Sequence, residues 1–168
     1  MTETVSPTDD NLILLDGLDS YSKHANKILG DARREIVILS NKLDFSLYDQ
    51  SSIAEHITQV IRNDRNAKVK ILIKDIRPLV ERGHQLLNLA RRLSSKVKLR
   101  KLLIEPENDS HAYLIADNSR LLYQHDDEEH VGFVNYKARP EAKKLLREFT
   151  YLWEQHSDED PSLRSLVI

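Results

Sequence analysis

Hydrophobic and polar positions along the chain follow two periods, one typical of strands and one typical of helices. Three runs are apolar or strictly alternating, as in strands, and they cover residues 35–40, 68–75 and 97–104. Three other runs place apolar residues three and four positions apart, as in helices, and they begin at Ser20, Ser51 and His84. Because strands that alternate with helices are joined by right-handed crossovers, this order predicts parallel pairing of the three strands.

The second half of the chain predicts antiparallel strands at the side of that sheet. Residues 111–123 have the pattern of a strand, a tight turn and a second strand, and a short strand follows around residues 131–136. Pro140 suits the first turn of a last helix that extends to about Gln155. Residues 11–15 form a further apolar run. The pattern therefore predicts an α/β fold, with a mixed sheet flanked by helices on both faces.

The length of the chain and the lack of a linker predict one domain. The 168 residues contain no internal repeat and no linker. We expect a flexible N-terminal tail at 1–10, a single domain at 11–156 and a C-terminal tail at 157–168, in which Leu163 and the apolar residues after it are able to dock back. The segments 41–48 and the region of Pro78 are expected to be loops.

Composition excludes several classes of function. The chain has no cysteine, which rules out disulfides, thiolate metal sites and cysteine nucleophiles. No apolar run approaches the ~20 residues of a membrane helix, and the N-terminus does not resemble a signal peptide, so we expect a cytoplasmic protein without membrane contact. A net charge of −2 predicts no attraction of the whole molecule to nucleic acid. No glycine-rich nucleotide loop and no His-Glu-x-x-His pattern occurs, so neither a cofactor nor a metal is expected.

The order of elements over residues 19–155 resembles one half of the phospholipase D-like superfamily. Ile36–Ser40 and Val69–Ile73 resemble its first two core strands, and Phe149-x-x-x-Trp153 resembles its closing helix. The likeness is greatest to single-domain bacterial members without an assigned activity. It implies two halves that work together, within a chain or as a dimer, and a His-x-Lys motif with an aspartate seven residues after the histidine. In that motif the histidine is the nucleophile and the lysine holds the phosphate.

The chain departs from that motif at its decisive position. His111 matches the histidine, but Tyr113 stands at the lysine position and Asp117 comes six residues after His111. The Gly-Ser or Gly-Thr pair that usually follows is absent, since Leu121-Leu-Tyr-Gln124 stands there. Tyrosine brings no positive charge, and losing one such stabilising contact typically costs about 10²–10³ in rate. We therefore predict a catalytically inactive domain that binds a protein partner or a second copy of itself.

Two other interpretations of the hairpin stay open. One is a divergent phosphodiesterase or nuclease that acts as a homodimer through His111, with a cation supplied from elsewhere in the chain. The other is an ordinary hairpin, in which Asp117 forms the turn because aspartate favours such positions. His111 would then lie at the far end of the strand, about 20 Å from Asp117, a distance that disfavours direct pairing.

Charged side chains suggest three further sites. A basic stripe for nucleic-acid phosphates would consist of Lys96, Lys98, Arg100 and Lys101. A charged edge strand explains the same residues, and no aromatic side chains interleave to stack bases. The acidic run between His125 and His130 has metal-binding residue types but no ordered spacing, so we interpret it as a solvated loop. A cleft at the carboxyl ends of the strands would combine the following residues: His111, Ser40, Asn41, Lys42, Asp44, Asp75, Arg77 and Arg82.

Overall fold

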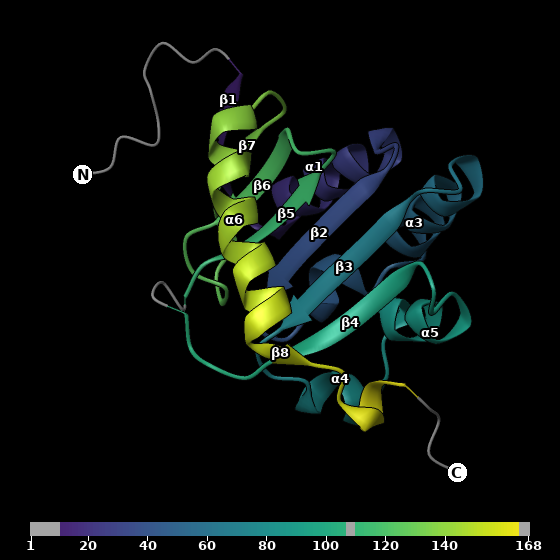
Figure 1. The fold of residues 1–168 in the computed structure, drawn as a ribbon. Helices are drawn as coiled ribbons and strands as arrows, with labels where there is room; N and C mark the ends of the chain where they lie inside the picture. Colours follow the sequence, from purple (N-terminus) through teal and green to yellow (C-terminus); the bar gives the residue numbers. More distant parts are fainter. Residues whose placement is uncertain (1–10, 107–109, 165–168) are drawn as a thin grey trace.

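An eight-stranded mixed sheet forms the centre of the computed structural model, which describes residues 11–106 and 110–164 (Figure 1). The strand order is β1-β7-β6-β5-β2-β3-β4-β8. The strands are β1 (Leu12–Asp16), β2 (Glu35–Ser40), β3 (Lys68–Ile73), β4 (Val97–Leu102), β5 (Ala112–Ala116), β6 (Arg120–Gln124), β7 (Val131–Asn135) and β8 (Ser157–Asp158). Strands β2, β3 and β4 are parallel to one another, as predicted, and every other pairing in the described sheet is antiparallel.

Helices cover both faces of the sheet, which confirms the predicted α/β class. They are α1 (Leu18–Asp31), α2 (Phe45–Tyr48), α3 (Ser51–Asn63), α4 (Arg77–Arg82), α5 (Gln85–Arg92) and α6 (Arg139–Gln155). Figure 1 shows α1, α3 and α5 behind the sheet and α6 alone across its other face. Two separate apolar clusters match these layers, because α1, α3 and α5 contribute to one and α6 to the other.

The period of two along the strands decides which helix each side chain meets. In the register of the parallel strands, Ile38 pairs with Ile71 and Ile71 with Leu99, and all three belong to the cluster under α1, α3 and α5. The next residues, Leu39 and Leu72, belong to the cluster under α6. The central strands are buried on both sides, as the continuous apolar runs predict.

Local differences from the predicted elements have identifiable causes. The segment expected to be a loop at 41–48 contains the short helix α2, whose first turn is capped by the Asp44 side chain accepting from the Ser46 N–H. Pro78 lies in the first turn of α4, where its missing N–H costs no helical bond. His84 precedes α5 and caps it, since its Nδ1 accepts from the Leu86 N–H at 3.0 Å.

The chain after α6 continues the fold, although it is predicted as a tail. Strand β8 pairs with β4, and the Arg100 guanidinium donates to the Ser157 carbonyl at 2.9 Å. Leu163 is buried in the apolar cluster, as the expected docking requires. The predicted tail at 1–10, residues 107–109 and residues 165–168 lie outside the described part. None of the described helices is long and apolar enough to cross a membrane.

Candidate functional site

His111 lies where the parallel strands β2, β3 and β4 reach their carboxyl ends, immediately before β5. Its residue exposure is only 4%, and both ring nitrogens have partners. Nδ1 is 2.9 Å from the Tyr123 hydroxyl, and Nε2 is 3.0 Å from Oε1 of Glu148. The imidazole is therefore fixed in position between β6 and α6.

Tyr113 shares the same carboxylate partner. It is two residues beyond His111, so both side chains project from the same face of β5 toward α6. The Tyr113 hydroxyl donates to Glu148 Oε1 at 2.9 Å and lies 3.2 Å from the Leu145 carbonyl. A single carboxylate oxygen thus contacts the two residues that occupy the histidine and lysine positions of the resembled motif.

The ionisation of this cluster follows from burial and neighbouring charge. Burial raises the pKa of Tyr113 well above its usual range, and the Glu148 charge raises it further. For Glu148, burial favours the neutral form, but the contacts with His111, then Tyr113 and Lys74, outweigh it and lower the pKa. At neutral pH the site therefore holds a carboxylate anion beside an uncharged phenol.

A cation does lie next to His111, and it comes from β3. Lys74 follows the last residue of that strand, and its Nζ donates to the His111 carbonyl oxygen at 3.1 Å. The same ammonium group pairs with Asp127 at 2.8 Å, and both side chains are largely buried. Burial raises the pKa of Asp127, and the Lys74 charge offsets part of this rise. These contacts direct Lys74 to a backbone oxygen and a carboxylate instead of the imidazole.

Asp117 lies at the opposite end of β5, in the turn to β6. Its backbone has a positive φ of 53°, and its carboxylate accepts bonds from the N–H groups of Arg33, Arg34 and Glu35 at 2.8, 2.9 and 3.0 Å. Arg120 adds an ion pair at 3.2 Å. Asp117 therefore ties the hairpin turn to the connection between α1 and β2, and the structure does not bring it to His111.

Two hollows mark the edge where the parallel strands end. One, of about 540 Å³, is lined by polar residues that include Asn41, Lys74, Ser110 and Asp127. The other, of about 370 Å³, is lined by residues that include Ser40, Lys42, Asp44 and His130. Of the expected cleft, these hollows contain Ser40, Asn41, Lys42 and Asp44, but not His111.

The other expected cleft residues line neither hollow. Asp75 and Arg77 pair with each other at 3.0 Å, and the Arg82 guanidinium lies over the Phe45 ring.

Glu148 and Lys74 are the site residues that sequence reasoning missed. Glu148 had a detectable signal, because it shares a helical face with the apolar residues Leu145, Phe149 and Leu152. A carboxylate on such a face needs a buried partner. Lys74 had a weaker signal, as a polar residue directly after an apolar strand.

The acidic loop between His125 and His130 contributes to the fold through pairs of residues. His130 Nε2 contacts Asp44 at 2.5 Å, and Asp127 binds Lys74. In the described part of the chain, no group of three or more histidine or acidic side chains is placed to hold a metal ion.

The predicted basic stripe is divided between the faces of β4. Lys98 and Arg100 alternate with apolar residues that belong to the α5 side, so they lie on the α6 face, and Lys101 lies on the other. Lys96 precedes the strand and donates to the Arg65 carbonyl oxygen. On the α6 face the register adds Lys70 of β3 directly opposite Lys98.

Comparison with known proteins places this fold. A family model described as a domain of unknown function, DUF7931, matches residues 17–166. No match was found among the curated proteins.

Solved structures share the fold at low sequence identity. TrmBL2, an archaeal chromatin protein, has a TM-score of 0.63 and 15% sequence identity. The match covers 93% of this chain and 57% of the TrmBL2 chain. NucT from Helicobacter pylori has a TM-score of 0.56 and 12% sequence identity, and the match covers 88% of this chain and 96% of the NucT chain. Phosphatidylserine synthase from Haemophilus influenzae has a TM-score of 0.57 and 11% sequence identity, and the match covers 94% of this chain and 41% of the synthase chain. The chain thus spans about half the length of the first and third, and its fold is phospholipase D-like.

Proposed function

We propose that this chain, which belongs to the DUF7931 family and has a phospholipase D-like fold, acts by binding and does not cleave phosphodiesters. One observation carries the proposal. Oε1 of Glu148 contacts both His111 and Tyr113, at 3.0 and 2.9 Å. In the resembled motif a phosphate oxygen would occupy the position between those two residues.

Electrostatics supports this conclusion. A phosphate anion about 4 Å from the Glu148 carboxylate would be repelled by roughly 4 kcal/mol at the effective dielectric constant of a protein surface. Tyr113 offers no compensating positive charge, because a phenol is neutral when protonated and anionic when deprotonated. Burial and the Glu148 charge raise its pKa and keep it neutral. A substrate phosphate would have to displace Glu148 and break both of its hydrogen bonds before it reached the imidazole.

A divergent phosphodiesterase is the second candidate, and Lys74 is the observation in its favour. Its ammonium group is 3.1 Å from the His111 carbonyl oxygen, so a cation is present beside the histidine. Activity would require that ammonium group to leave Asp127 and turn toward the ring. Both side chains are largely buried, so breaking this pair would leave a buried charge without a partner. Such a loss costs several kcal/mol.

Hydrolysis of bis-p-nitrophenyl phosphate separates the two candidates. We expect the wild-type protein and His111→Ala to release p-nitrophenol at the same background rate over a wide range of protein concentrations, which also covers a dimer. Release by the wild type that His111→Ala abolishes would establish the enzyme and overturn the proposal. Lys74→Met then tests whether that cation takes part.

Two classes of partner are consistent with a binding function. Nucleic acid is one, because TrmBL2, whose fold is similar, is a chromatin protein that binds DNA. A protein or a second copy of this chain is the other. Strand β1 is at the edge of the sheet, and Ile13 and Leu14 in it are 43% and 69% exposed.

A partner strand can pair with such an edge. If copies pair there, light scattering shows a dimer that Leu14→Lys dissociates. A wild-type protein that stays monomeric at all concentrations tested would rule out self-association through β1.

A further inference from the structure

The outer surface of α6 carries a concentration of positive charge. Arg139, Lys143, Lys144 and Arg147 are all exposed. Arg139, Lys143 and Arg147 are spaced by four residues, so they follow one another along the helix. In the described part of the chain none of the four has an ion-pair partner.

Helix stability does not explain this arrangement. Like charges four residues apart destabilise a helix by about 0.2–0.5 kcal/mol per pair, and Arg139, Lys143 and Arg147 form two such pairs. Arg139 also stands in the first turn, where the helix dipole favours acidic side chains. The cluster therefore opposes the stability of α6, which points to a role in contact with an anion.

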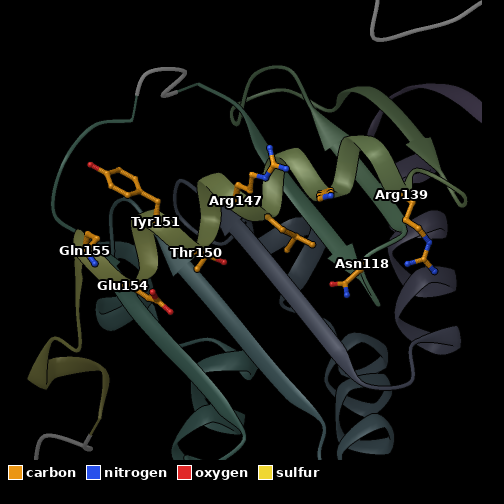
Figure 2. A pocket seen from close by; sticks show the side chains of 9 residues that line it. Asn118, Arg139, Arg147, Thr150, Tyr151, Glu154 and Gln155 are labelled. Carbon is orange, nitrogen blue, oxygen red and sulfur yellow. The ribbon is translucent and has the colours of Figure 1, made fainter.

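A groove of about 800 Å³ accompanies these cations (Figure 2). Arg139, Lys143 and Arg147 line it together with Asn118, Thr150 and Tyr151. Asn118 comes from the turn between β5 and β6, so the groove is built from two elements distant in sequence. Its lining supplies three cations, one carboxylate from Glu154, neutral hydrogen-bonding groups and an aromatic ring, so positive charge predominates. Tyr151 is 56% exposed.

The positive charge continues on the same face of the sheet. Lys70 and Lys98 lie opposite each other on β3 and β4 and project toward the side that α6 occupies. The Lys70 ammonium group is 5.6 Å from the ring centre of Trp153 on α6. Cations from the helix and from the strands thus lie on the same side of the sheet.

We propose that the α6 groove binds the phosphate backbone of a nucleic acid. Successive cations on the helix are about 6 Å apart along its axis. One strand of a DNA duplex places a phosphate about every 3.4 Å along the duplex axis, so this spacing is close to two phosphate steps along that axis. Asn118 and Thr150 provide hydrogen bonds to phosphate or sugar oxygens, and Tyr151 provides a surface for stacking a base. A membrane surface is a poorer fit, because the apolar side of α6 is buried against the sheet.

This inference rests on the proposed binding function and names its ligand. Fluorescence anisotropy with labelled 20-nucleotide single-stranded and duplex DNA at 50 mM salt tests it. We expect binding that weakens steeply between 50 and 200 mM salt. The double variant Lys143→Glu/Arg147→Glu is expected to bind at least tenfold more weakly and to lower the slope of log K against log salt by about two.

The matched control is Lys23→Glu/Arg62→Glu. It also reverses one lysine and one arginine on the outer sides of helices, but on α1 and α3, which cover the opposite face. Binding that the control preserves within twofold supports the α6 groove. Three results would overturn the α6 groove: an equal loss of DNA affinity in both double variants, no DNA binding at 50 mM salt, or polyglutamate that competes as well as unlabelled DNA. Cleavage of the bound DNA would overturn the absence of catalysis instead, so the two failures are distinguishable.

Discussion

Replacement of Asp117 by alanine tests whether this residue of the degenerate motif now stabilises the fold. The substitution removes the acceptor for three backbone N–H groups at residues 33–35, at distances of 2.8 to 3.0 Å. Each bond contributes about 1 kcal/mol net, and alanine at a positive φ costs a further 1–2 kcal/mol. Because the side chain is 19% exposed and water compensates in part, we expect a loss of about 2–4 kcal/mol.

Urea unfolding measures this loss. With a slope near 2 kcal/mol per M, the midpoint should fall by about 1–2 M. Asp117→Gly retains the backbone freedom and should be about 1 kcal/mol more stable than the alanine variant. Glu154→Ala, an exposed acid on α6, serves as the control and should stay within about 0.5 kcal/mol of wild type. An Asp117→Ala variant as stable as this control would refute the structural role.

Two further changes probe the core and the site. Gly132→Ala places a methyl group against the Tyr123 carbonyl and the Tyr21 hydroxyl, so we expect a loss of more than about 3 kcal/mol by thermal unfolding, and wild-type stability would contradict the packing of β7. In Glu148→Gln the dependence of stability on pH should change, because the folded state lowers the pKa of Glu148. Ionised Glu148 stabilises the folded state above its unfolded-state pKa of about 4.3, and this contribution is lost as pH falls. The difference in free energy of unfolding between wild type and variant should therefore narrow from about pH 5 to pH 3.

The sequence predicts the framework of the fold because its strands are strongly patterned. Residues 35–40 and 68–73 are continuous or alternating apolar runs, and they form β2 and β3 as predicted. Strand β8 has no such signal, since Ser157 and Asp158 are polar and join the sheet only through β4 and Arg100. Short polar segments of this kind depend on tertiary contacts that local pattern does not encode.

The candidate site is predictable only in part for a related reason. His111 and Tyr113 adjoin the same recognisable strand, so their common face follows from the period of two. Glu148 comes from α6, 35 residues beyond Tyr113 in the chain, and its meeting with them depends on how that helix crosses the sheet. The basic side chains of α6 and of β4 likewise come to the same side of the sheet only in three dimensions.

Titration of the His111 imidazole with inorganic phosphate, followed by NMR, tests most directly whether Glu148 fills the phosphate position. Its resonances are assigned by comparison with His111→Gln. We expect no saturable shift in the wild-type protein and a saturable shift in Glu148→Ala, where the position between His111 and Tyr113 is vacated. A saturable shift of His111 in the wild type would show that phosphate reaches the imidazole despite Glu148, and would contradict the claim that Glu148 fills the phosphate position.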